Sequence, residues 1–464
     1  MKSLLVGLLV LGMCPVSAQE LPARLDKVIR SSAIPKDDLG LFVVDLAHVP
    51  QRMVFQLNAE KDFVPASITK LVTATAVLRR LGPSFRFQTT LWSEAPVKEG
   101  VLKGDLILKG GGDSGFVSET MWFLVNEFVR TGITKVEGNV VVDDFEFDSI
   151  RADPSRVKDR VDRAYDAPVG AMSFNWNSIN VYVRAGEKGK PPHVYLDPVT
   201  NGYAVENKAK TVTGTDADIS VAREGERIVV RGTMGVNSPE TVAYKNVDDP
   251  VEWSGRNLIF FLGQRGITVT GKVVHGTRPS AARLLGKAES KPVRDHVADM
   301  MKFSNNYVAE MLTKALAAQN GNIPASLDKG MEIIRATLRD MGIADKNYGL
   351  INPSGLSRRN HMRPRDLAEI LVQGFKHFPT FAELLASLPL AGTDGTLKNR
   401  MKGPPAQGWV RAKTGLLKGV VGLAGYAGHK DGSVKAFAFI YNGTGAKESS
   451  ARGLFDRLAT ELVQ

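Results

Sequence analysis

Residues 65–72 read Pro65-Ala66-Ser67-Ile68-Thr69-Lys70-Leu71-Val72. Apolar residues continue behind it until Gly82-Pro83, a typical helix stop, so we predict a helix from about Ser67 to Leu81. Ser67 and Lys70 are three positions apart and therefore share one face of that helix. The helix dipole favours a negative charge developing on Ser67. A lysine whose pKa is lowered can take the serine proton, which is the Ser–Lys form of nucleophilic catalysis.

A Ser-x-x-Lys pair alone is weak evidence, because a second pair occurs at Ser155 and Lys158. That second pair lies in a charged, irregular stretch without an apolar helix behind it. The helix after Ser67 can be buried and can hold both side chains rigid. We therefore favour Ser67 as the nucleophile.

A Ser-x-Asn motif supplies the next groups that such a site needs. Ser304-Asn305-Asn306 lies between two predicted helical segments, 293–302 and 308–318. The Ser304 hydroxyl can relay a proton to a leaving amine, and the Asn306 amide can bind a substrate peptide group. Two other matches, at Ser173 and Ser178, lie in a β-rich region, so we prefer Ser304.

The third motif is Lys413-Thr414-Gly415, on a predicted edge strand that begins at Val410. Lys413 supplies positive charge and Thr414 a hydroxyl, which suit a substrate carboxylate. Gly415 lets the backbone approach a ligand closely. The backbone N–H of the next residue, Leu416, can form an oxyanion hole with that of Ser67. Each motif alone is more often structural than catalytic, but the three in this order form a strong signal.

The three motifs together resemble the signature set of penicillin-binding proteins and class A β-lactamases. The long gap between Ser67 and Ser304 is similar to that of class C low-molecular-weight penicillin-binding proteins, the DacB or peptidase S13 type, which carry two extra domains there. Residues 104–113, 354–358 and 390–397 resemble further stretches of that family. The resemblance covers nearly the whole chain after its first residues.

The resemblance implies a serine-type D-Ala-D-Ala carboxypeptidase or endopeptidase that acts on peptidoglycan stem peptides and cross-links. Ser67 attacks the D-alanyl carbonyl, Lys70 accepts its proton, and Ser304 passes a proton to the leaving amine. Water then hydrolyses the acyl-enzyme. β-Lactam antibiotics acylate the same serine, and no cofactor or metal is implied.

The resemblance also assigns substrate-binding residues on the far side of the site. Asp143 and Phe147 resemble insert residues that reach over the substrate, where an aspartate can pair with a diaminopimelate amino group. Asp144 competes with Asp143 for that role, and Arg358 is expected on the same side. Relatives often have Thr or Ser where this chain has Leu416, which leaves the preference for exo- or endopeptidase cleavage open.

The expected fold class is α/β (α+β). We expect a penicillin-binding, β-lactamase-like transpeptidase domain, an antiparallel sheet flanked by helices with a helical subdomain, interrupted by two β-rich domains. The expected ranges are 1–18 for a signal peptide, 19–87 and 284–464 for the catalytic domain, 88–107 and 200–283 for one insert, and 108–199 for the other.

The first eighteen residues read as a secretory signal peptide, with Lys2, an apolar run and Ala18 at the cleavage site, and this predicts a soluble protein exported to the periplasm. Cys14, the only cysteine, lies in that segment, so the mature chain can form no disulfide or cysteine metal site. The net charge of +11 comes from scattered residues. It favours peripheral contact with a polyanionic envelope over nucleic acid, although a solvated basic surface explains it equally well.

Two other functions share the scaffold. A β-lactamase has the same motifs but deacylates rapidly, usually with an added glutamate base, and the long insert argues against it. A catalytically silent peptidoglycan-binding protein is disfavoured because all three motifs are intact. A metal hydrolase is disfavoured because no His-Glu-x-x-His occurs. The oligomeric state stays open.

Overall fold

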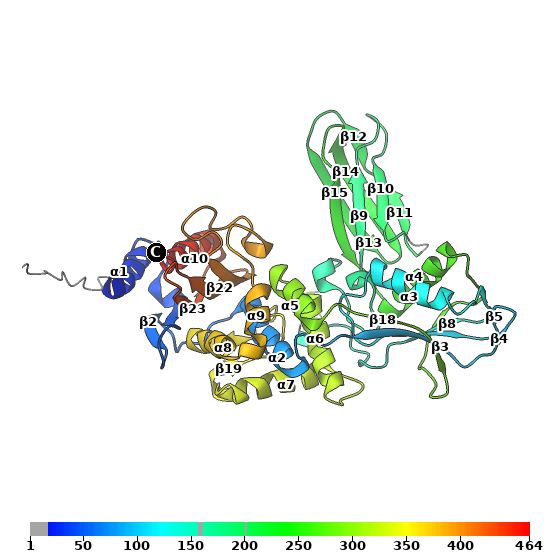
Figure 1. Cartoon of the computed structure of the whole chain (residues 1–464). Coiled ribbons are helices and arrows are strands. Elements are labelled where there is room, and N and C mark those ends of the chain that lie inside the picture. Colours follow the sequence, from blue (N-terminus) through cyan, green and yellow to red (C-terminus); the bar gives the residue numbers. More distant parts are fainter. Residues whose placement is uncertain (1–16, 156–160, 200–201) are drawn as a thin grey trace, which may run out of the picture.

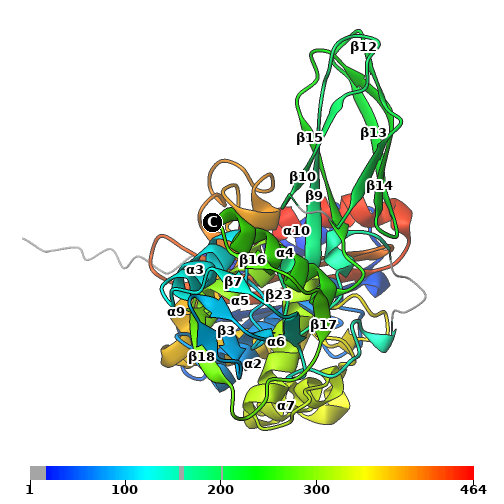
Figure 2. The same cartoon turned by 90° about the vertical axis from the view of Figure 1, so that its right-hand side faces the viewer.

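The computed structural model of the chain describes residues 17–155, 161–199 and 202–464. The expected signal peptide lies outside these ranges except for its last two residues, and Cys14 and Lys158 lie outside them too. Figures 1 and 2 show an elongated molecule with one body around α1, α10 and β23, a second around β3, β8 and β18, and a narrow group of strands that projects as a finger. Within the described ranges, no helix combines the length and apolar character needed to cross a bilayer.

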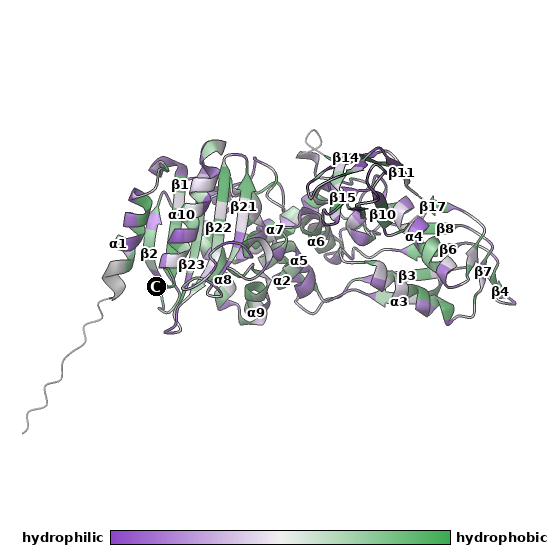
Figure 3. Cartoon of the chain, turned by 90° about the horizontal axis from the view of Figure 1, so that it is seen from above, coloured by the Kyte–Doolittle hydropathy of each residue, from purple (hydrophilic) through white to green (hydrophobic). Residues whose placement is uncertain are grey.

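The first body is built on a five-stranded antiparallel sheet. Its order is β2 (Arg52–Leu57), β1 (Leu39–Asp45), β23 (Val434–Asn442), β22 (Val420–Gly428) and β21 (Val410–Leu417). Figure 3 shows that β21 and β22 are largely hydrophobic, as expected of strands covered on both faces. One face packs against α1 (Ser17–Arg30) and α10 (Glu448–Glu461), and the other against α2 and α8.

Six helices form the helical part of this body. They are α2 (Lys70–Leu81), α5 (Val293–Lys302), α6 (Asn306–Gln319), α7 (Leu327–Asp340), α8 (Pro364–Lys376) and α9 (Phe378–Ser387). Helix α6 is buried along almost its whole length, and α2 packs against α5, α6, α7 and α8. The residues at the starts of α2 and α6 are therefore held rigidly beside the sheet.

The second body contains another five-stranded sheet and two helices. Its strands are β17 (Val273–His275), β8 (Val140–Asp143), β6 (Leu106–Lys109), β3 (Gln88–Ser93) and β18 (Arg283–Glu289). A small sheet adds β16 (Thr268–Val269), β7 (Lys135–Val136), β5 (Val101–Leu102) and β4 (Val97–Lys98). The helices are α3 (Ser118–Val129) and α4 (Pro250–Gln264).

The finger consists of two packed sheets. One has the order β10 (His193–Asp197), β9 (Ser178–Arg184), β15 (Thr241–Asn246). The other contains β11 (Ala204–Asn207), β14 (Arg227–Gly235), β12 (Lys210–Val212) and β13 (Ala217–Glu224). Alternate residues of β9 are buried against β14, so the opposite face of β9 points outward.

The expected mixed fold, with an antiparallel sheet flanked by helices, is confirmed by this architecture. The strand pairing, however, divides the insert differently from the expected ranges. β8 pairs with β6 and β17, so residues on both sides of position 108 share one sheet, and the finger spans only about 178–246. β18 pairs with β3, which places residues 283–289 in the insert. Such pairing joins strands that are far apart in sequence, and no local pattern encodes it.

Helices α3 and α4 interrupt the region that the sequence analysis describes as β-rich. The start of α4 has a local sequence signal for a helix, which the prediction of a β-rich region did not use. Asp249 accepts a hydrogen bond from Val251 N as the helix cap, and Pro250 occupies the first turn.

Candidate active site

Ser67 lies in a short 3-10 turn, η2 (Ala66–Thr69), directly before α2. The predicted helix is thus present from Lys70 to Leu81, and Ser67 occupies the turn that leads into it. Ala66 has a left-handed φ of 49°, and the Thr69 hydroxyl donates to the Ala66 carbonyl at 2.8 Å. This turn leaves the Ser67 side chain half-buried at the edge of the sheet.

Lys70 is fully buried, and its Nζ lies 3.2 Å from Ser67 Oγ. The same nitrogen donates to Asn306 Oδ1 and to the Ser354 carbonyl, each at 2.6 Å. These two acceptors fix the amine beside the serine hydroxyl. A proton leaving Ser67 therefore has an adjacent nitrogen to receive it.

A second serine and lysine pair completes the cluster. Lys413 Nζ lies 2.9 Å from Ser304 Oγ and donates to the Thr414 carbonyl at 2.8 Å. Burial lowers the pKa of Lys413 to about 7. Ser304 has a left-handed φ of 56°, a strained conformation of the kind that clusters at functional sites. Asn306, two residues on, joins this pair to Lys70.

The strand β21 closes directly over the nucleophile turn. A Cβ atom on Gly415 would lie 2.9 Å from the Pro65 carbonyl oxygen and 3.3 Å from Ile68 N, so glycine permits this approach. Leu416 follows with its side chain exposed. At the rim, Thr414 Oγ1 donates to Thr396 Oγ1 at 2.8 Å. The structure thus brings all three motifs together around Ser67.

Comparison with known proteins agrees with this geometry. Residues 21–461 match the D-Ala-D-Ala carboxypeptidase 3 (S13) family. The chain belongs to this S13 family. A D-alanyl-D-alanine carboxypeptidase of Actinomadura sp. (strain R39) is 30% identical over 465 residues, 95% of this chain and 85% of the relative. The carboxypeptidase DacB of Haemophilus influenzae is 29% identical over 415 residues, 86% of this chain and 85% of the relative.

The crystal structure of penicillin binding protein 4 (dacB) from Haemophilus influenzae has the same fold, with a TM-score of 0.77 and 25% identity. The match covers 96% of this chain and 100% of that one. The family predicted from the three motifs is confirmed. The chain is accordingly a serine-type carboxypeptidase of the S13 family.

Asn352 is a residue of this S13 chain that the sequence analysis did not place in the site. Its Oδ1 accepts hydrogen bonds from Ser354 N at 2.9 Å, Ser354 Oγ at 2.6 Å and Gly355 N at 2.8 Å. Its Nδ2 donates to Asp153 of the insert. This buried amide therefore holds the loop whose Ser354 carbonyl accepts from Lys70. In the sequence, its position directly before Pro353 and the Ser354-Gly355-Leu356 stretch is the one feature that could have pointed to this role.

Asp143 and Phe147 both lie in contacts that connect segments of the chain. Asp143 is buried in the insert, where its carboxylate accepts from Phe145 N at 3.2 Å and from Arg278 N at 2.8 Å. Phe147 is also buried, and it forms a β-bridge with Ala325. Both residues join chain segments in this way, and the expectation that they reach over a substrate stays a prediction.

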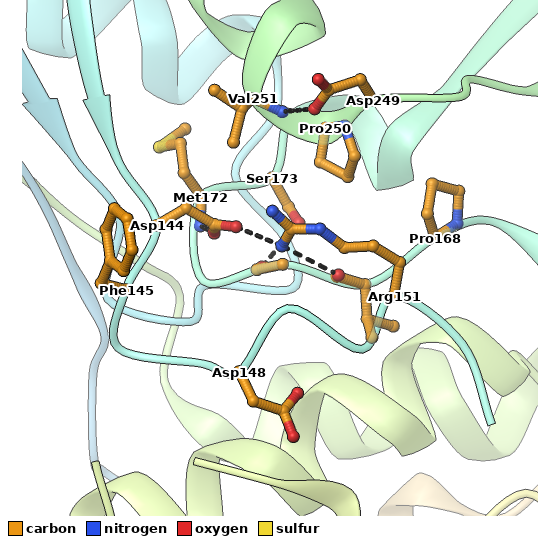
Figure 4. Close-up of polar contacts among 12 residues, drawn as sticks. Asp144, Phe145, Asp148, Arg151, Pro168, Met172, Ser173, Asp249, Pro250 and Val251 are labelled. Carbon is orange, nitrogen blue, oxygen red and sulfur yellow. Dashed lines mark hydrogen bonds and ion pairs between the residues drawn. The ribbon is translucent and has the colours of Figure 1, made fainter. Parts of the chain in front are cut away.

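Asp144 is likewise a structural carboxylate. It pairs with Arg151 and accepts from the backbone N–H of Met172 (Figure 4). Burial raises its pKa, and Arg151 opposes that shift. Arg358, in contrast, is exposed and donates to the carbonyl of Lys418, just beyond β21. Arg358 therefore lies beside the residues that follow β21, and its role in substrate binding stays a prediction.

Gly355→Ala is expected to disrupt the nucleophile turn. Gly355 has a φ of +81°, and a Cβ atom there would lie 1.9 Å from the Ala66 carbonyl oxygen. We expect the free energy of unfolding to fall by more than about 3 kcal/mol, measured by urea denaturation. The control is Gly342→Ala, where φ is +82° but nothing lies within 4 Å. It carries only the left-handed strain, about 1–2 kcal/mol. Equal losses in the two variants would contradict the close approach.

Lys413→Met is expected to stabilise the protein below neutral pH. The folded pKa of about 7 lies below the ordinary value of 10.5, so between these pH values only the unfolded chain holds the proton. Below pH 7 the folded wild type therefore carries the full free-energy cost of a buried charge on Lys413. This cost falls as the pH rises to about 10.5. We expect the variant to be more stable by a few kcal/mol at pH 6, with the difference shrinking toward pH 10. Urea denaturation across this range measures it, and a pH-independent difference would contradict burial of the charge.

Proposed function

We propose that this protein hydrolyses D-alanyl peptide bonds of peptidoglycan through an acyl-enzyme on Ser67. It would release terminal D-alanine from stem peptides and open D-alanyl cross-links. The observation that carries the proposal is the 3.2 Å contact between Lys70 Nζ and Ser67 Oγ, in a buried site that also contains the Ser304–Lys413 pair. The membership of the chain in the S13 family supports it.

Acylation begins with transfer of the Ser67 proton to Lys70 as Oγ attacks the D-alanyl carbonyl carbon. The N–H groups of Ser67 and Leu416 stabilise the oxyanion, a role supported by the close approach of Gly415 to the nucleophile turn. Asn306 binds the peptide group of the substrate when Lys70 turns to the serine. The bond from carbon to the leaving nitrogen then breaks.

Ser304 delivers a proton to the leaving amine, and Lys413 restores the proton to Ser304. The 2.9 Å contact and the lowered pKa of Lys413 support this relay, because an amine that titrates near neutrality can both give and take a proton. Thr414 and Thr396 offer hydroxyls to the carboxylate of the departing residue. Arg358 adds positive charge at the β21 rim.

Before deacylation, the proton that Lys70 took from Ser67 passes to the relay of Ser304 and Lys413, which replaces the proton given to the leaving amine. Lys70, now neutral, removes a proton from the attacking water and donates it to Ser67 Oγ as the acyl group leaves. β-Lactams acylate Ser67 in the same way and leave slowly, which agrees with the name of the penicillin-binding relative. We place the enzyme in the periplasm after removal of residues 1–18, where its basic surface meets the envelope.

Digestion of purified peptidoglycan, read by mass spectrometry, tests the proposal. Loss of terminal D-alanine reports carboxypeptidase activity, and conversion of cross-linked dimers to monomers reports endopeptidase activity. Nitrocefin provides the second measurement. A single stoichiometric burst is expected, whereas continuous turnover would make the protein a β-lactamase. Absence of both peptide products would overturn the proposal.

A further inference from the structure

A cavity of about 970 Å³ lies at the base of the finger, outside the Ser67 cluster. Helix α3, the start of β9, the end of β18 and helix α5 surround it, and its lining includes Phe123, Trp176, Asn180 and Asp197. Asp197 also lines a second hollow of about 630 Å³ along the finger, with Tyr182 and Tyr195. The two hollows share Asp197, and we call them together the junction groove.

Trp176 is presented to the junction groove by a strained turn. Asn175, Trp176 and Asn177 all have left-handed φ values, of 46°, 53° and 49°, which residues other than glycine rarely adopt. The two asparagines hold the turn: Asn175 Oδ1 accepts from Ser118 N at 3.0 Å, and Asn177 Nδ2 donates to the Pro168 carbonyl at 2.8 Å. Trp176 itself stays 39% exposed, and its indole N–H has no partner among the described residues.

Aromatic side chains continue from the groove along the outer face of the finger. The register places Tyr182 opposite Tyr195, and Asn180 opposite Asp197 and Tyr244. The rings of Tyr182 and Tyr195 lie 6.2 Å apart, and Tyr195 is 56% exposed. Figure 1 shows β9, β10 and β15 rising from the body that carries α3. The groove thus extends into a row of exposed rings.

The chemistry of this surface fits a carbohydrate. Flat aromatic rings with a polar edge can stack on the apolar faces of sugar rings, while amides and carboxylates bind their hydroxyl and acetamido groups. Charges beside the groove are mixed in sign and paired, as in Lys287 with Glu289 at 3.4 Å and Arg184 with Glu240 at 3.0 Å. A nucleic-acid site would instead present one sign of charge.

We propose that the junction groove binds glycan strands of N-acetylated amino sugars, with Trp176 and Tyr195 as the main contacts. This inference rests on the proposed function, because peptidoglycan is such a glycan bearing peptides. Helix α5 lines the groove through Asp299 and ends at Lys302, next to Ser304. Its 10 residues span about 15 Å, and an extended five-residue peptide reaches about 17 Å. Along this path we expect a glycan in the groove to present its peptide toward Ser67.

Binding to peptide-free glycan strands tests the inference. The probes are peptidoglycan strands stripped of peptides by an amidase, in co-sedimentation, and a soluble N-acetylglucosamine hexamer, in calorimetry. The wild type should bind both, and Trp176→Ala and Tyr195→Ala should each weaken binding at least about tenfold. The matched control is Trp409→Ala, because Trp409 is 41% exposed but lies away from the groove. It should bind like the wild type.

Activity measurements separate this inference from the proposed function. Trp176→Ala should keep the wild-type rate on a short soluble D-alanyl peptide and lose at least about fivefold on intact peptidoglycan. If the wild type binds intact peptidoglycan but not peptide-free strands, or if Trp176→Ala binds them normally, the groove is no glycan site, while peptide hydrolysis by Ser67 still stands. If short peptides are not hydrolysed and penicillin does not label Ser67, the proposed function fails whatever the glycan result.

Discussion

Ser67→Ala is expected to abolish covalent labelling by benzylpenicillin and to lower D-alanyl peptide hydrolysis by at least about 10⁴-fold. The variant keeps the oxyanion hole and the Lys70 amine but has no oxygen that can form the acyl-enzyme. Ser67 is only half-buried, and within the described residues its Oγ is held by a hydrogen bond from Lys70, so the fold should survive. Intact-protein mass spectrometry measures the labelling, and peptidoglycan digestion measures the hydrolysis.

The matched control for this variant is Ser155→Ala. Ser155 opens the other Ser-x-x-Lys pair, and in the structure its hydroxyl donates to Asp153 Oδ2 at 2.8 Å. Penicillin labelling of Ser155→Ala should therefore equal that of the wild type. A penicillin adduct on the Ser67→Ala protein would refute Ser67 as the nucleophile.

Lys70→Met is expected to slow acylation by about 10²–10⁴-fold while leaving the protein folded. Methionine fills the buried stem of the lysine but cannot accept the serine proton. Asn306 Oδ1 and the Ser354 carbonyl lose a donor in this variant, but both acceptors are neutral, so neither is left as a buried charge. Stopped-flow acylation by a chromogenic β-lactam gives the rate, and thermal unfolding checks the fold.

Lys314→Met is the control, since Lys314 is another buried lysine on α6. It forms an ion pair with Asp148 at 2.6 Å, so its loss leaves a carboxylate unpaired. We expect this variant to unfold at a lower temperature but to be acylated at the wild-type rate. A Lys70→Met protein that is acylated as fast as the wild type would exclude Lys70 as the base.

Much of the candidate site could be predicted because its parts are local. The apolar run after Ser67 and the stop at Gly82 define α2 within a few residues, and a spacing of three places Lys70 beside Ser67. The preference for Ser304 over Ser173 rests on helical context, and Asn306 does contact Lys70. Local periodicity carries this information without any knowledge of the remaining chain.

The rest depends on contacts between distant segments. Asn352 acts through a loop that meets Lys70 only in the folded chain, and the left-handed φ of Ser304 has no sequence signature. Asp143 lies in a stretch that resembles the family's insert motif, yet its side chain is buried. Its contact with the backbone N–H of Arg278 joins residues far apart in sequence, so the sequence alone does not show it. The division of the insert into sheet and finger likewise follows from pairing across more than one hundred residues, as between β8 and β17.

The antiparallel pairing of β1 with β23 has a consequence for the order in which the enzyme matures. Leu39–Asp45 cannot complete its sheet until Val434–Asn442 has left the ribosome, and Lys413 is also made late. The insert, whose strands all lie within residues 88–289, can fold while the C-terminal part is still being synthesised. Ser67 is therefore synthesised early but gains its partners late, and the newborn chain carries no working hydrolase until its last strands are in place.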